Sequence, residues 1–516
     1  MTRFSRPLAV LALGALAACG GPTSSTAIPN TGGNGSVPQP ATAGMLVGVG
    51  DSLTAGYQSS GFLGDPTVTN PNSGYPSGAV PPGQEAGWWA DMYNQMTGVA
   101  NSAAGVLPLI KGPGLASQIV IGTSAANLLY TTHSSCDAFN QQGFSSSAWT
   151  NTRMNPSAGV ADLAVPGITM HEAVAMKGPI TGPPTGANCG YTTLPNDPTS
   201  GGLQSLVAGE SELFYPVLGG YLPGLGSNLT MLNAAVSLKP QLTTVWLGAN
   251  DILKYSFSGG IPQPVSDTPQ QMATDLTQIV TTLTKAGSKV LVADLPDVLS
   301  SAQFFPQTKL SADLQSLGIP SAAAGAIVSY VGTQYGVTAG GYLTETGFLS
   351  IVQGCNLAPA TCVTPQLDPN GAGSGLGGAY LTPAFAGQVQ ALNDAYNQAI
   401  DGVAKSSGTS VALVPINQIF KGVAQTGYSV AGFPLPFTLH FGGGLVSWDG
   451  LHPSNTGYAV IANAFIQTAD APTASGGLGL SIPALTAAQI STIAQQDPYD
   501  SYAIKSVNPL FPFPLP

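Results

Sequence analysis

The stretch Met45-Leu46-Val47-Gly48-Val49-Gly50-Asp51-Ser52-Leu53-Thr54 decides how the rest of the sequence is interpreted. Its first six residues are nearly all apolar, which is typical of a strand buried in a parallel sheet. Gly48 and Gly50 are expected to relieve crowding where the backbone turns sharply. Ser52 would then lie near the N-terminus of a following helix, where free backbone N–H groups favour a developing negative charge. Asp51 and Ser52 could equally cap that helix, so this stretch alone leaves two interpretations open.

Four downstream segments also have strand character, at residues 159–165, 242–247, 289–293 and 410–415. Helical periodicity predicts helices around them, at residues 84–96, 170–176, 206–218, 229–238, 268–285, 382–405, 454–468 and 486–496. Strands that alternate with helices predict an α/β fold with a parallel sheet and helices on both faces. Sites in such sheets form at the carboxyl ends of the strands, so the turns that follow the strands are expected to converge.

Composition limits the classes of partner. The chain has 516 residues, of which 43% are hydrophobic and only 7% are charged. Such a hydrophobic content argues against general disorder, and 66 glycines and 43 prolines indicate long irregular connections. A net charge of −11 disfavours nucleic acid and anionic lipid as electrostatic partners, because no basic surplus is available to neutralise phosphates.

The N-terminus carries an export signal. Two arginines precede an apolar run at residues 8–18, which is too short to span a bilayer. The run ends Leu16-Ala17-Ala18-Cys19-Gly20, which resembles a bacterial lipobox. The resemblance implies a signal peptide at residues 1–18, lipidation of Cys19, and a lipid anchor in the bacterial cell envelope, with Gly20 favouring the outer membrane. An ordinary secreted protein cleaved nearby is the alternative.

Residues 20–44 carry no charge, so residues 19–44 are interpreted as the lipidated cysteine and a flexible linker.

Four cysteines remain after Cys19, namely Cys136, Cys189, Cys355 and Cys362. An even number in an exported chain suggests two disulfides, for which three pairings are possible. A short loop from Cys355 to Cys362 and a longer closure from Cys136 to Cys189 are favoured. Structural zinc is less favoured, because no pair has Cys-x-x-Cys spacing.

Four motifs occur in order: Gly50-Asp51-Ser52-Leu53, Val165-Pro166-Gly167, Gly248-Ala249-Asn250-Asp251 and Asp449-Gly450-Leu451-His452-Pro453. Together they resemble the GDSL esterase/lipase family, also called SGNH hydrolases. The resemblance covers residues 45–470 and implies a three-layer α/β/α sandwich with a central parallel sheet, of the flavodoxin-like kind. Long loop insertions at about 58–160 and 300–380 are unexplained by it. Residues 471–516 would form a C-terminal tail that packs on the domain.

The resemblance also assigns roles. Ser52 is the nucleophile, His452 the general base and Asp449 the acid that orients the imidazole. The oxyanion hole consists of the backbone N–H groups of Ser52 and Gly167 and the side-chain amide of Asn250. No metal or organic cofactor is implied. The neighbouring Asp51 and Asp251, outside these roles, are expected to bond the backbone around their turns.

The expected function is hydrolysis of carboxylic esters, as an esterase or lipase, through an acyl-serine intermediate. A short-to-medium acyl ester or a lipid is the expected substrate. Carbohydrate O-deacetylation, acyl transfer on the same site, and an idle surface lipoprotein that binds glycans or lipids are the alternatives. The stripe of Trp88, Trp89, Met92 and Met96 is expected to pack in the core, although it could line an acyl pocket. A surface or packing role is expected for His171.

Overall fold

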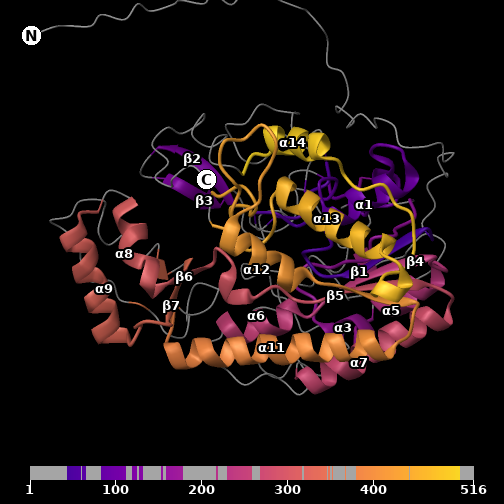
Figure 1. The fold of residues 1–516 in the computed structure, drawn as a ribbon, viewed down its shortest axis with the longest axis horizontal. Coiled ribbons are helices and arrows are strands. Elements are labelled where there is room, and N and C mark those ends of the chain that lie inside the picture. Colours follow the sequence, from indigo (N-terminus) through magenta and orange to yellow (C-terminus); the bar gives the residue numbers. More distant parts are fainter. Residues whose placement is uncertain are drawn as a thin grey trace, which may run out of the picture.

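A computed structural model gives the fold of the chain (Figure 1). It describes residues 44–59, 61–65, 83–111, 119–124, 127–131, 153–154, 158–177, 217–218, 229–257, 268–316, 319–345, 347–348, 351, 367, 379–440 and 442–499. The predictions for the signal peptide, the lipidated Cys19, the four other cysteines and most of the helix at 206–218 lie outside these residues.

Four parallel strands form the central sheet in the order β1-β4-β5-β9. Their bounds are Leu46–Gly50 for β1, Leu242–Trp246 for β4, Lys289–Ala293 for β5 and Val411–Val414 for β9. Each was predicted from an apolar run, and the α/β class with a parallel sheet is confirmed. β1 and β4 are buried along their whole length, which explains why their sequences show no alternation of apolar and polar residues.

The strand predicted at 159–165 is reduced to a single bridge between Asp162 and Gly48. The segment still runs alongside β1, because the N–H of Val165 donates to the carbonyl of Gly50 at 3.0 Å. The carboxylate of Asp162 accepts the N–H two residues on at 3.2 Å, and such local bonds compete with a sheet ladder. The turn that follows is nevertheless carried to the carboxyl end of β1.

Gly48 and Gly50 relieve crowding, as expected, but they do so in straight, closely packed backbone, so the expectation of a sharp turn there is wrong. Neither has a positive φ. A Cβ on Gly48 would lie 2.5 Å from Oδ1 of Asp162 and 2.9 Å from Nε1 of Trp89. A Cβ on Gly50 would overlap the side chain of Thr54. Both positions therefore need glycine because neighbouring side chains occupy the space.

The helices that contact the sheet form two groups. In one, α1 (Trp88–Thr97) packs with α13 (Asn455–Asp470), which also contacts β5, β9 and α14 (Ala487–Gln496). In the other, α7 (Pro269–Lys285) packs with α3 (Met170–Ala175), α5 (Met231–Ser237) and α11 (Pro383–Ser406). All seven were predicted, and α1 begins later than expected because residues 84–87 form turns. No helix in the described ranges is long and apolar enough to cross a membrane.

Two helices beside the strand ends were not predicted, α6 (Ala249–Phe257) and α12 (Ile416–Thr426), nor was the hairpin of β2 (Ile119–Ser124) and β3 (Asn127–Thr131). A separate accessory unit lies between β5 and α11 in the chain, at the left of Figure 1. It comprises β6 (Phe304–Pro306), α8 (Gln307–Ser316), α9 (Ser321–Tyr335), β7 (Tyr342–Thr344) and β8 (Tyr380–Leu381). Its three strands are antiparallel, and most of its buried side chains form a second cluster, while Phe304 of β6 and Leu381 of β8 belong to the main core.

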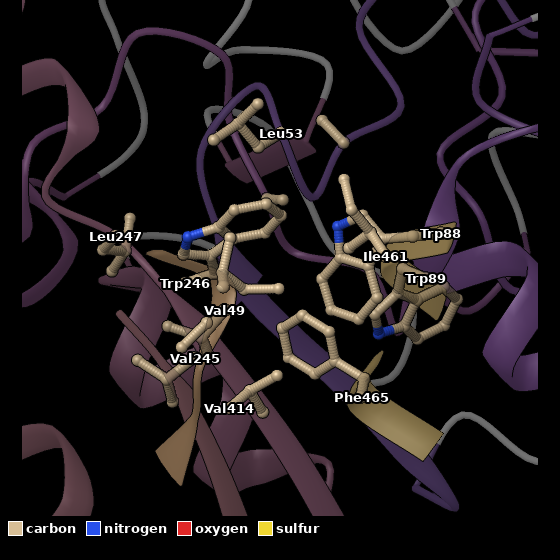
Figure 2. Close-up of a cluster of buried hydrophobic side chains, with 14 of the residues drawn as sticks. Val49, Leu53, Trp88, Trp89, Val245, Trp246, Leu247, Val414, Ile461 and Phe465 are labelled. Carbon is tan, nitrogen blue, oxygen red and sulfur yellow. The ribbon is translucent and has the colours of Figure 1, made fainter. Parts of the chain in front are cut away.

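The tryptophan stripe of α1 lies in the main core (Figure 2). Trp88 stacks on Phe465 of α13 with ring centroids 3.9 Å apart, and its edge faces Trp246 of β4 at 5.9 Å. Trp88 and Trp89 are both fully buried, and neither lines the cavity beside Ser52. The core-packing prediction is confirmed.

Replacing Phe465 with alanine is expected to lower the free energy of unfolding by about 3–5 kcal/mol. The change removes a ring stacked between two helices in a close-packed interior. Urea denaturation followed by circular dichroism measures the loss. Phe385→Ala, at a half-buried position of α11, is the matched control and should cost clearly less. Equal losses in the two variants would contradict the prediction.

Candidate active site

Ser52 lies just beyond the carboxyl end of β1, in a series of tight turns. The N–H of Ala55 donates to the carbonyl of Asp51 at 3.0 Å, which completes one helix-like turn. The helix expected after Ser52 does not form, so that prediction is wrong. Gly56 and Ser59 adopt φ values of 71° and 51°, and these left-handed conformations interrupt a helix before a second turn.

The Asp449 and His452 side chains form a buried pair on the loop before α13. Nδ1 of His452 lies 2.8 Å from Oδ2 of Asp449. The other carboxylate oxygen accepts the backbone N–H groups of His452 at 2.8 Å and Leu451 at 3.0 Å, and the hydroxyl of Ser447 at 3.2 Å. Both oxygens therefore have partners, and the imidazole is oriented with Nε2 as the ring nitrogen left for another group.

These partners favour the ionised form of Asp449. Burial acts to raise the pKa of Asp449, but the nearby His452 and the hydrogen bonds that the carboxylate accepts outweigh it. The net pKa lies below the ordinary value, so the group is ionised at neutral pH. An ionised carboxylate at this position stabilises a positive charge on the imidazole.

The segment after Ser52 is hydrogen-bonded directly to the Asp449–His452 loop. The N–H of Ser59 donates to Oγ of Ser447 at 2.9 Å. The side-chain amide of Gln58 donates to the carbonyl of the residue after His452 at 3.1 Å. The ring of Tyr57 packs on the ring of His452 with centroids 4.8 Å apart. These contacts hold the histidine against the serine turn, and Ser52 and His452 border the same cavity.

Asn250, in the first turn of α6, connects the turn after β4 to the serine turn and to the turn that contains Gly167. Its amide donates to the carbonyl of Ile168 at 3.0 Å and to Oδ2 of Asp51 at 3.4 Å. The next residue, Asp251, accepts the N–H of the first residue of α3 at 3.2 Å. Gly167 lies on the same turn as Ile168 with φ of 87°. The four motifs are thus brought together at one edge of the sheet.

Asp51 is part of the electrostatics of this edge. It is 1% exposed, and its other carboxylate oxygen accepts the N–H of Leu53 at 3.0 Å. Burial raises the pKa of Asp51 to about 7, although the Leu53 N–H and the charge of His452 act to lower it. Asp51 therefore links the serine turn to the Asn250 amide through its own carboxylate.

An apolar cavity of about 630 Å³, including its solvent-open part, lies beside Ser52 and His452. Its walls come from segments far apart in the chain, with Leu53 on the serine turn, Trp246 of β4, Leu253 on α6, Val298 after β5, Phe420 on α12, and Leu439 and Leu451 on the loop before α13. Neither Gly167 nor Asn250 lines it, although Ala249, next to Asn250, does.

The remaining predicted residues lie elsewhere. His171 Nδ1 is 3.0 Å from Oδ2 of Asp275 on α7, a packing role of the expected kind. No sequence signal indicated that Tyr57, Gln58 and Ser59 are neighbours of the histidine loop, because they are almost 400 positions from it.

Comparison of the sequence with models of known protein families and with curated proteins gives no match. The interpretation of the site therefore depends on its own geometry.

Proposed function

We propose that the chain is a serine esterase of the SGNH type, which cleaves carboxylic esters through an acyl-serine intermediate. The observation that carries the proposal is the buried Asp449–His452 pair, with 2.8 Å between Oδ2 and Nδ1, at the border of a cavity that Ser52 shares. A serine hydroxyl needs a general base to attack a carbonyl, and an oriented imidazole is the usual one.

In the proposed reaction, Oγ of Ser52 attacks the ester carbonyl while Nε2 of His452 accepts its proton. The oxyanion would accept hydrogen bonds from the N–H groups of Ser52 and Gly167 and from the Asn250 amide, which would give up its longer bond, at 3.4 Å, to Asp51. Collapse of the tetrahedral intermediate releases the alcohol, which takes the proton from His452. Water then attacks the acyl-serine with the same base, and the acid product leaves.

Two wider inferences accompany this proposal. The α1–α13 group and the α7–α11 group would form the outer layers of a three-layer α/β/α sandwich around the sheet. The lipobox-like sequence would place the enzyme on the bacterial outer membrane through lipidated Cys19. Because no charge-rich surface is needed for such an anchor, the low charge of the chain is compatible with it.

The apolar cavity supports an ester with an aliphatic acyl chain as the substrate. A chain that enters it loses contact with water, and each buried methylene contributes about 0.8 kcal/mol. We expect kcat/KM for p-nitrophenyl esters to rise about fourfold per methylene from acetate until the cavity is filled. Equal or better turnover of acetylated sugars than of octanoate would favour a deacetylase instead.

Trapping of the acyl-enzyme tests the proposal directly. The protein is mixed with p-nitrophenyl butyrate, quenched in acid within a turnover, and measured by intact mass and peptide mapping. We expect one butyryl group on the peptide that contains Ser52. A label on a different residue, or ester turnover with no label and no burst of p-nitrophenol, would overturn the acyl-serine mechanism.

Replacing Asn250 with alanine is expected to lower kcat by about 10²–10³-fold, with KM changed less than threefold. The amide would act on charge that develops only in the transition state, so ground-state binding changes little. Steady-state kinetics with p-nitrophenyl butyrate gives both constants. Asn233→Ala on the exposed side of α5 is the control, with kinetics like the wild type. A raised KM with unchanged kcat would remove Asn250 from the oxyanion hole.

A further inference from the structure

The accessory unit contacts the proposed catalytic acid, Asp449, through Gln303, which is in turn held by Glu345; no motif assigned either residue. Gln303 immediately precedes β6 and Glu345 immediately follows β7, next to the strand pair Phe304 and Thr344. The N–H of Glu345 donates to the carbonyl of Gln303 at 2.8 Å. The side-chain amide of Gln303 donates to Oε2 of Glu345 at 3.1 Å. The two residues thus extend the small sheet by one more pair.

The same amide group reaches the catalytic loop. Nε2 of Gln303 also donates to the main-chain carbonyl of Asp449, which is 146 positions away. The next residue, Gly450, has φ of 67° and packs on the backbone just before β6. A Cβ on Gly450 would lie 3.1 Å from the carbonyl carbon of Ala302 and 3.2 Å from the nitrogen of Gln303. The peptide bond that follows Asp449 therefore packs against residues 302–303, where the chain enters the accessory unit.

Glu345 holds Gln303 close to the ionised Asp449, so its own protonation state matters. Burial raises the pKa of Glu345 to about 8, and the negative charge of Asp449 acts in the same direction. At neutral pH Glu345 is therefore mostly uncharged. It can hold the Gln303 amide without bringing a second negative charge beside Asp449.

We propose that Gln303 is a positioning residue, which fixes the backbone of Asp449 and makes the accessory unit a working part of the active site. The inference depends on the proposed esterase function. Gln303 contacts neither substrate nor reacting atoms and acts through Asp449, whose carboxylate orients His452. An acid whose backbone is fixed at its carbonyl keeps one orientation of the imidazole during both proton transfers.

Gln303→Met tests the proposal, since it removes the amide and keeps the length of the side chain. The variant loses the bonds to Glu345 and to Asp449, and we expect the loss of the bond to Asp449 to lower kcat for p-nitrophenyl butyrate about five- to tenfold, with KM changed less than twofold. Gln315→Met is the matched control in the same accessory unit. Its amide is exposed and, among the residues that the structure describes, bonds only within α8, to Ser311, so kcat should stay at the wild-type value.

A second measurement needs no turnover. The proton between Nδ1 of His452 and Asp449 is expected to give a low-field proton NMR resonance, assigned by its loss in His452→Gln. Gln303→Met should shift or broaden this resonance, and Gln315→Met should not.

An unchanged resonance and an unchanged kcat in Gln303→Met would overturn the proposal. A raised KM with unchanged kcat and a lowered melting temperature would also overturn it, in favour of a purely structural contact. Absence of Ser52-dependent turnover in the wild type would instead sink the esterase function, whatever the resonance shows.

Discussion

Ser52→Ala is expected to lower kcat for p-nitrophenyl ester hydrolysis by about 10⁶-fold, the loss seen when a catalytic serine is removed from such a triad. Without Oγ no acyl-enzyme can form, and any remaining rate would come from water attacking a bound ester beside the oxyanion donors. The variant deletes one oxygen at a nearly buried position, so the fold should be preserved. Burst kinetics and steady-state turnover, from acetate to palmitate, measure the effect.

The control for this prediction is Ser237→Ala, at the C-terminal end of α5. Within the described part of the chain its hydroxyl bonds only to a carbonyl of its own helix, and the variant should keep wild-type kinetics. Both variants should show circular dichroism spectra and melting temperatures close to those of the wild type. Turnover by Ser52→Ala within tenfold of the wild type, at any chain length, would exclude Ser52 as the nucleophile.

The sheet could be predicted because its evidence is local in the sequence. β1, β4, β5 and β9 are apolar runs bounded by glycine, polar turns or proline, and parallel strands need such runs when both faces are covered. The convergence of the four turns followed from topology, because parallel strands present their carboxyl ends at one edge. The hydrogen bonds of Asn250 to Ile168 and Asp51 are the contacts that this convergence allows.

The structure of the serine turn could not be predicted in the same way. A helix after Ser52 agrees with local rules, but the chain instead returns at Gly56 and Ser59 to meet the histidine loop. The contacts of Gly48 with Asp162 and Trp89 are likewise long-range, so the sequence suggested a turn where the structure has close packing. Both errors arose where tertiary contacts override a local preference.

The cavity and the contact between the accessory unit and Asp449 also depend on long-range contacts, so they could not be predicted from the sequence either. The cavity wall combines α6, the turn after β5, α12 and the loop before α13, and no short motif contains more than one of these. The role proposed for Gln303 likewise depends on its contacts with Gly450 and Asp449, which are distant from it in the sequence. The chemistry proposed for the site is therefore encoded in short motifs, while its substrate pocket and support depend on distant segments.

Asp449→Asn is expected to lower kcat by about 10⁴-fold with little change in KM. Oδ2 of Asp449 meets Nδ1 of His452, while Oδ1 accepts two N–H groups and the Ser447 hydroxyl. An asparagine that keeps its oxygen toward those donors must turn its NH₂ toward Nδ1, which then becomes an acceptor. The imidazole proton moves to Nε2, and the ring can no longer take the proton of Ser52.

The pH dependence separates this tautomer effect from a simple loss of charge. The pKa of Asp449 lies below the ordinary value because of His452 and the hydrogen bonds, which outweigh burial, so the group stays ionised at mildly acidic pH. Loss of wild-type activity at mildly acidic pH should therefore not come from Asp449. In Asp449→Asn the activity should rise as pH increases, because hydroxide can take the proton of Ser52 in place of the imidazole, whose Nε2 already carries a proton. Asp394→Asn, exposed on α11, is the charge-matched control and should keep the wild-type profile. A variant Asp449→Asn with kcat within tenfold of the wild type at neutral pH would show that this carboxylate does not orient the base.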